Sequence, residues 1–115
     1  MNEFLFLFRG GEAYLSRQSK EVVQAETKKW IGWIENLRRQ ERYAGGHSLD
    51  PGGKMVRGKN KVVTDGPFAE GKELVGGYFL IRAKNISEAV EMSKASPIYE
   101  YDGSVEVRPI QKMEM

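Results

Sequence analysis

Asp65 is the carboxylate whose sequence surroundings point most clearly to chemistry. It follows the apolar pair Val62-Val63 and precedes Gly66 in the segment VVTDGPFAEGKE. A carboxylate at a strand end can project into a cavity beside Phe68, and burial there favours its protonated form, which suits a general acid or base. The sequence therefore nominates Asp65 as the catalytic candidate.

The same turn also has a structural interpretation. Asp65 could accept hydrogen bonds from the backbone amides of the turn, with Gly66 supplying an unusual φ. Pro67 would then make the turn rigid, and Phe68 would anchor it in the core. We rank this structural role first, and it does not exclude the catalytic one.

Other acidic side chains and one histidine occur near Asp65 in the sequence. Glu70 and Glu73 follow it closely enough to border the same cavity. With His47 and Asp50 they could also hold a hard cation through oxygen atoms. No recognised metal spacing is present, so we predict no metal site. His47, the single histidine, is either a loop residue or a catalytic partner of Asp65, and both interpretations stay open.

Aromatic side chains supply hydroxyl groups and ring surface near the presumed sheet. Tyr78, Tyr99, Tyr101, Trp30 and Trp33 have spacings that are usually those of a core. They can also line a pocket between sheet and helix, where a few polar groups in an apolar cleft mark the default site for a small molecule. We predict such a ligand. The residues predicted to contact it are His47, Gly66, Pro67, Phe68, Glu70 and Tyr78.

The charge of the chain nominates no macromolecular partner. Eighteen basic and sixteen acidic residues leave a formal net charge of +2, too small for the long-range field that drives nucleic-acid binding. Basic residues cluster at 38–42 and 54–61, but Glu35 precedes Arg38 and Arg39 at the spacing of ordinary helix pairs. The glycine-rich segments lack the lysine-hydroxyl ending of a phosphate-binding loop. We therefore predict neither nucleic-acid binding nor a cofactor.

Length and composition are those of a globular protein. The chain has 115 residues, of which 40% are hydrophobic and 30% charged, and a typical domain has roughly 100–200 residues. Without cysteine it can form no disulfide or thiolate metal site, in agreement with a reducing compartment. The apolar run near the N-terminus is too short for a membrane span. We expect a single domain over residues 1–115, located in the cytoplasm and without a membrane partner.

The predicted elements occur in the order strand, helix, hairpin, strand, helix, strand. Residues 4–8 are apolar on both alternating sets, so this strand should be covered on both faces. Ser19 can cap a helix over residues 20–44 that stops at Gly45-Gly46. Residues 55–57 and 61–64 fit a hairpin. In the strand over residues 74–82, Gly76-Gly77 mark a bulge or a close approach.

The C-terminal half completes a split βαβ arrangement. Asn85 and Glu88 form a capping-box-like start to the second helix, Pro97 ends it, and residues 104–108 form the last strand. Right-handed crossovers place both helices on one sheet face. Because residues 4–8 are apolar on both faces, we predict a homodimer with its sheets face to face. The alternative is a monomer whose second face is shielded by the hairpin and the C-terminal tail.

The segment VTDGPFAEGKELVGGYFLIRA, followed by a helix and then GSVEVRPI, resembles the DGPF branch of the YCII-related family. The resemblance covers residues 45–110, and the aromatic first strand and long first helix fit it. It implies an α+β fold: a ferredoxin-like split βαβ domain with an inserted hairpin, paired into a dimeric α/β barrel.

The resemblance implies less about activity. Enzymatic function is suggested in the family by a pocket and by histidine and aspartate residues, and some members of the branch accompany extracytoplasmic-function sigma factors. This chain has no histidine in its first helix and has Ser96 before Pro97, where relatives often have histidine. A His/Asp dyad therefore does not transfer. The residues that do are Asp65, Gly66, Pro67 and Phe68.

The sequence and this resemblance leave three functions open. The first is a cofactor-independent enzyme that transfers a proton on a small organic molecule, with Asp65 as acid or base. The second is a non-catalytic ligand-binding or regulatory module, associated with a sigma factor. The third is a structural dimer whose motif serves folding alone.

Overall fold

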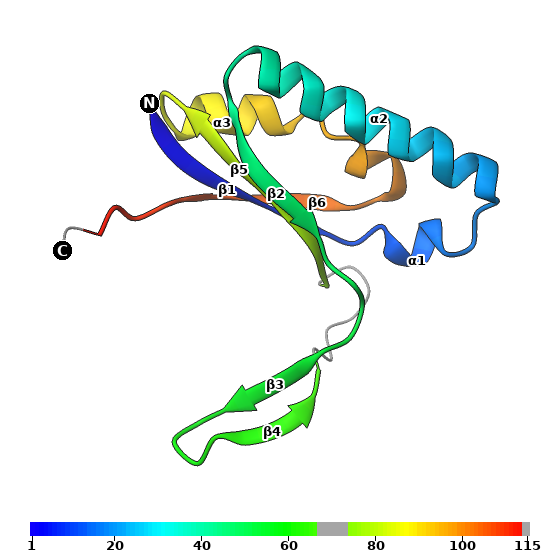
Figure 1. Cartoon of the computed structure of the whole chain (residues 1–115), viewed down its shortest axis with the longest axis vertical. Coiled ribbons are helices and arrows are strands. Elements are labelled where there is room, and N and C mark those ends of the chain that lie inside the picture. The colour runs from blue at the N-terminus through cyan, green and yellow to red at the C-terminus, as the bar shows by residue number, and fades with distance from the viewer. Residues whose placement is uncertain (67–73, 114–115) are drawn as a thin grey trace.

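The computed structural model describes residues 1–66 and 74–113 and contains a four-stranded antiparallel sheet in the order β2-β5-β1-β6 (Figure 1). The strands are β1 (Asn2–Arg9), β2 (Tyr43–Ser48), β5 (Val75–Ala83) and β6 (Ser104–Pro109). Helices α2 (Lys20–Arg39) and α3 (Ile86–Ser93) lie on the same side of this sheet. The order and connections are those of a ferredoxin-like α+β fold, which confirms the predicted fold class.

Alternating side chains of β1 point to the two faces of the sheet. Phe4, Phe6 and Phe8 are buried beneath the helices, and the ring of Phe6 stacks on Trp33 of α2 with centroids 6.3 Å apart. Leu5 lies on the opposite face and is half-buried. The core therefore sits between the sheet and the helices. In the described part of the chain no helix covers the other face, which we call the open face.

Both helices begin at the residues that the sequence predicts. The Oγ of Ser19 accepts a hydrogen bond from the amide of Val22 at 3.3 Å, and the Oδ1 of Asn85 accepts one from the amide of Glu88 at 2.9 Å. These bonds satisfy amides that have no partner within the helix. Within residues 1–66 and 74–113, neither α2 nor any other helix combines the length and apolar character of a membrane span.

The predicted end of α2 at residue 44 is wrong, because the helix ends at Arg39. Glu41 adopts a left-handed conformation with a φ of 60°. Its amide donates to the carbonyl of Arg38 at 2.9 Å, and the amide of Arg42 donates to the carbonyl of Leu37 at 2.8 Å. This is the Schellman pattern of helix termination. Glutamate here takes the place usually held by glycine, so the sequence carried no signal for this end.

Residues that we predicted as helix end and loop form the edge strand β2. Gly45 and Gly46, which indicated a helix stop, lie inside this strand. A Cβ on Gly46 would lie 2.5 Å from the carbonyl oxygen of Tyr78 and 2.6 Å from the ring of Phe79. Glycine is therefore required where β2 lies against β5. Tyr43 adds an edge-on contact with Phe79, with centroids 5.2 Å apart.

The predicted hairpin is present as a separate two-stranded sheet made of β3 (Lys54–Arg57) and β4 (Val62–Asp65). Figure 1 shows it set apart from the main sheet, and we call it the arm (residues 54–65). Val56, Val62 and Val63 are 60%, 56% and 62% exposed, respectively. The arm thus has little packing beyond its own ladder.

Both features predicted for the glycine pair of β5 are present. The register of β1 with β5 shifts where Phe8 pairs with Gly77 and Arg9 pairs with Val75, which leaves Gly76 as the bulged residue. A Cβ on Gly77 would lie 2.8 Å from the carbonyl oxygen of His47, so β2 approaches closely there.

Two short helices complete the structure beside this end of the sheet. They are α1 (Glu12–Leu15) and the 3-10 helix η1 (Pro97–Tyr101). As predicted, Pro97 follows the end of α3, and Ser96 before it is extended with φ −64° and ψ 137°. The Oγ of Ser96 accepts from the amide of Ile98 at 3.2 Å and so caps η1.

Replacing Glu41 by glycine should raise the free energy of unfolding by about 0.5–1 kcal/mol. A Cβ is strained in the left-handed region, and glycine removes that strain at some cost in chain entropy. Urea denaturation monitored by circular dichroism measures the change. The control Glu35→Gly, at an exposed position within α2, should lower stability by about 1 kcal/mol. Equal losses in both variants would contradict the helix end described here.

Candidate ligand-binding site

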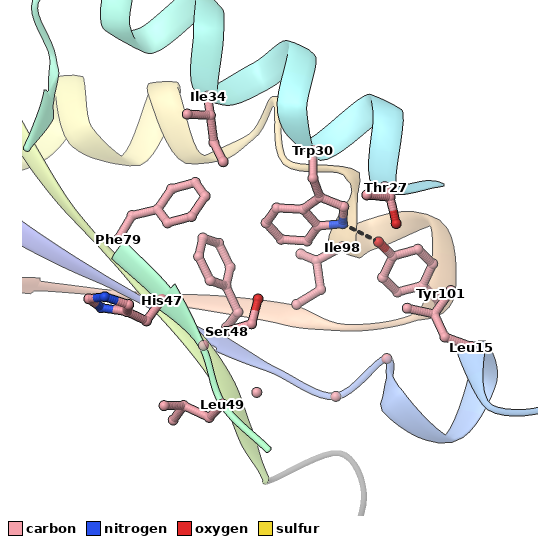
Figure 2. Close-up of a pocket in the computed structure, with 15 residues that line it drawn as sticks. Leu15, Thr27, Trp30, Ile34, His47, Ser48, Leu49, Phe79, Ile98 and Tyr101 are labelled. Atoms are coloured by element: carbon pink, nitrogen blue, oxygen red, sulfur yellow. Dashed lines mark hydrogen bonds between the residues drawn. The ribbon is translucent and has the colours of Figure 1, made fainter. Parts of the chain in front are cut away.

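A cavity of about 340 Å³ lies between α2 and one end of the main sheet (Figure 2). Helix α2 contributes Thr27, Trp30 and Ile34 to its lining. The sheet contributes residues of β1, β2 and β5, and α1 and η1 close its side with Leu15, Ile98 and Tyr101. Segments far apart in the sequence therefore meet at one site.

One wall of the cavity is aromatic. Phe8 of β1 makes edge-to-face contacts with Trp30 and Phe79, with centroids 5.0 and 4.8 Å apart and interplanar angles of 88° and 79°. Trp30 meets Phe79 in the same manner at 6.0 Å and 89°. Such arrangements are preferred by aromatic rings and hold each ring in a defined orientation. The wall can receive another ring in the same edge-to-face geometry.

Glycine makes up another part of the cavity lining, which we call the glycine wall. Gly10 and Gly11 follow β1, and Gly76 and Gly77 are the second and third residues of β5; all four line the cavity. A Cβ on Gly11 would lie 2.7 Å from the Cδ2 of Tyr101. The missing side chains leave space and bring backbone close to whatever occupies the cavity.

Tyr101 gives the cavity a polar end. Its hydroxyl accepts a hydrogen bond from the Nε1 of Trp30 at 2.5 Å, as Figure 2 shows. The residue is 7% exposed, and burial raises the pKa of Tyr101 above its ordinary value. Its hydroxyl is therefore neutral at physiological pH and can act as a hydrogen-bond donor.

Two further hydroxyl groups belong to the lining. The Oγ1 of Thr27 donates to the carbonyl of Val23 at 2.9 Å, which leaves its oxygen able to accept a bond. Ser48 lies on the cavity side at the end of β2. The cavity thus has polar groups on both α2 and the sheet, separated by apolar rings.

His47 and Tyr78 come together as cross-strand neighbours of β2 and β5. The Nδ1 of His47 lies 2.8 Å from the hydroxyl oxygen of Tyr78, at hydrogen-bond distance. Figure 2 shows the imidazole pointing away from the aromatic wall. Although His47 belongs to the cavity lining, its ring is therefore on the open face.

Asp65, the predicted catalytic residue, lies at the end of the arm's second strand. Its side chain is 76% exposed and forms an ion pair with Lys54 on the paired strand. It is not part of the described cavity lining. The apolar burial expected around its carboxylate is absent among the described residues, so the premise for an acid or base role is not met in one copy of the chain.

The remaining predicted ligand contacts, apart from Tyr78, follow Asp65 in the sequence. Gly66 is buried, and its amide donates to the carbonyl of Gly53 at 3.1 Å, which closes the base of the arm. Pro67, Phe68 and Glu70 lie outside the described residues. In residues 1–66 and 74–113, no group of three or more histidine, aspartate or glutamate side chains could hold a metal ion.

The sequence indicated Trp30 and Tyr101 as pocket-lining candidates but not their hydrogen bond. The two residues are 71 positions apart, and their contact depends on how η1 folds back against α2. Thr27 and Ser48 carried no signal, because isolated hydroxyl residues are common on helix surfaces and at strand ends. The pairs Gly10-Gly11 and Gly76-Gly77 can be seen in the sequence. The sequence does not show that both pairs line the same cavity.

Comparison with known proteins places the chain among proteins of related fold. An uncharacterised protein of Rhizobium meliloti (strain 1021) is 43% identical over 53 residues, a segment that spans 43% of this chain and 40% of that relative. A solved structure, 5-chloro-2-hydroxyhydroquinone dehydrochlorinase (TftG) from Burkholderia phenoliruptrix in complex with 2,5-dihydroxybenzoquinone, matches with a TM-score of 0.56. The match covers 95% of this chain and 93% of that one at 13% identity, which shows a shared fold.

The family comparison covers more of the chain than the sequence relative does. The model of the YCII-related domain matches residues 4–114. This span includes all strands of the main sheet except the first two residues of β1, and both helices that cover it. The chain therefore belongs to the YCII-related domain family.

Proposed function

We propose that the protein binds a small planar organic molecule in the cavity between α2 and the main sheet. The observation that carries this proposal is the cavity itself, with an aromatic wall, a glycine wall and hydroxyl groups at its edge. Its volume of about 340 Å³ lies at the lower end of the roughly 300–1,000 Å³ of ligand pockets. A ligand of one ring with small substituents suits this size.

The position of the cavity supports a link with the DGPF turn. The chain leaves the cavity at Leu49 and returns to it at Gly76, and the amide of Leu49 donates to the carbonyl of Gly76 at 2.9 Å. The segment between them carries the arm and the turn. A ligand in the cavity would therefore lie beside the base of the segment in which we predicted the site residues.

An enzymatic role has support from the dehydrochlorinase that shares the fold, since that protein is seen in complex with a one-ring compound. We propose that proton transfer on a small organic molecule, without a cofactor, is the reaction class to test first. Asp65 as its acid or base stays a prediction. A regulatory role beside a sigma factor and a cytoplasmic location also stay predictions.

We propose that the protein is a homodimer whose copies meet through the open face. Leu5 and Leu80 are directly paired there, and Leu7 pairs with Tyr78 beside them. The side chains on this face alternate with the buried phenylalanines of β1, and the leucines are only half-buried in one copy. An apolar patch at the centre of an uncovered sheet is better buried against a second copy than left in water.

Narrowing the cavity should abolish ligand binding without unfolding the protein. The sequence has two tryptophans, so an NMR spectrum of the ¹⁵N-labelled protein contains two indole signals, which Trp33→Phe assigns. Added phenol should shift the indole signal of Trp30, because the side chain of Trp30 lines the cavity. In Ile34→Phe the larger side chain fills part of the cavity, so this shift should be lost. Ile31→Phe, at a position 50% exposed, is the control and should bind phenol normally. Absence of a Trp30 shift in the wild type would contradict the proposed function.

Replacing Leu80 by lysine should dissociate the dimer, because a charged group would be buried at the centre of the interface. Sedimentation velocity should show a species of twice the 13.1 kDa chain mass for the wild type and the monomer for Leu80→Lys. Ile31→Lys, at an exposed position on α2, should remain dimeric. A monomeric wild type at micromolar concentration would refute the dimer while leaving the cavity proposal intact.

Asp65→Asn separates the two interpretations of the turn. We expect the free energy of unfolding to change by less than about 1 kcal/mol, because exposed ion pairs such as that with Lys54 contribute little. Loss of phenol affinity at unchanged stability would support a role at the ligand. A loss of about 1–2 kcal/mol with normal binding would support a turn-locking role. Asp50→Asn, in the loop before the arm, is the control.

A further inference from the structure

Among the described residues, the hydroxyl of Tyr101 accepts a hydrogen bond but donates none. Its oxygen accepts from the Nε1 of Trp30, and a tyrosine hydroxyl can also donate once. No acceptor for that proton is found among residues 1–66 and 74–113. The Oε2 of Glu26, a nearby buried carboxylate oxygen, does not receive it, since this atom has no hydrogen-bond partner there. A buried donor left without an acceptor is unfavourable.

Neighbouring residues hold Tyr101 in place at the end of the cavity. Tyr14 of α1 stacks on its ring, with centroids 5.6 Å apart and planes inclined by 20°. Gly11 lies so close to the ring of Tyr101 that a Cβ on Gly11 would clash with the Cδ2 of Tyr101. The indole of Trp30, which fixes the hydroxyl, is itself held edge-on by Phe8. The unused donor therefore has a defined position before any ligand arrives.

The charges around this end of the cavity disfavour an anion. Glu26 and Glu100 lie close enough for their charges to raise the pKa of Tyr101 further, after the larger effect of burial. Lys29 is engaged by both carboxylates, at 3.1 and 2.6 Å. The described lining contains no lysine or arginine, and the ring of His47 points away from the aromatic wall. An anionic ligand would be desolvated there without a counter-ion.

From these observations we infer that Tyr101 determines which ligands the cavity accepts. Its hydroxyl donates a hydrogen bond to an uncharged oxygen acceptor, such as a carbonyl or amide oxygen, carried by a ring packed against Phe8, Trp30 and Phe79. The bond from Trp30 polarises the hydroxyl and strengthens it as a donor. This inference rests on the proposed function, because it names the ligand class of the same cavity.

Three one-ring probes of similar size test the inference: benzamide, benzoate and toluene. They are titrated into the full-length wild type, and affinities are read from the indole NMR signal of Trp30. Benzamide should bind at least about 10-fold more tightly than benzoate, which lacks a counter-ion in the cavity. Tyr101→Phe, which keeps the ring and removes the hydroxyl, should weaken benzamide binding about 3- to 10-fold and leave toluene binding unchanged. Tyr99→Phe, at a position of η1 that is 45% exposed and outside the described cavity lining, is the matched control and should leave all three affinities unchanged.

The possible results separate this inference from the proposed function. Unchanged benzamide affinity in Tyr101→Phe, with toluene still bound, would overturn the role of the hydroxyl and leave the cavity as an apolar binding site. Tighter binding of benzoate than of benzamide in the wild type would overturn the preference for an uncharged acceptor, and this comparison needs no variant. Failure of all three probes to shift the Trp30 signal would contradict the inference and the proposed function together.

Discussion

The edge-to-face contacts among Phe8, Trp30 and Phe79 are the interaction on which the rest of the structure depends. They join the two central strands of the sheet to α2 at the point where the helix passes over the strand ends. Trp30 is held there by its ring, and its indole nitrogen then fixes the hydroxyl of Tyr101. Trp30 therefore belongs both to the core packing and to the polar end of the cavity. A change that moves this side chain alters both.

Glycine determines where this packing leaves space. The aromatic rings fill the middle of the sheet, but Gly10, Gly11, Gly76 and Gly77 supply no side chains at its end. Two of these positions are also required by close approaches, of Gly11 to the ring of Tyr101 and of Gly77 to the backbone of β2. The cavity is therefore a consequence of sterically necessary glycines beside a rigid aromatic wall, and not of loose packing.

The sequence predicted the parts of the fold that depend on local patterns, and missed those that depend on distant contacts. Helix caps at Ser19 and Asn85 and the glycine bulge of β5 follow from short-range geometry. The end of α2 was missed because Glu41 adopts a conformation that its residue type does not favour. At the site, His47 and Tyr78 were named separately, but their pairing depends on the register of β2, a strand hidden by the expected helix. The contact of Trp30 with Tyr101 likewise exists only in three dimensions.

The alternation of β5 and β2 couples the cavity to the open face. Phe79 faces the cavity, while Tyr78 faces the other side and reaches His47; Ser48 then returns to the cavity side. Gly77 lets the backbones of β2 and β5 approach closely. A movement of either strand therefore moves the side chains on both faces of the sheet. A second copy packed on the open face would bear on Tyr78 and Leu80, and thus on the strand that carries the aromatic wall. A ligand in the cavity and a second copy on the open face would thus contact opposite faces of β5.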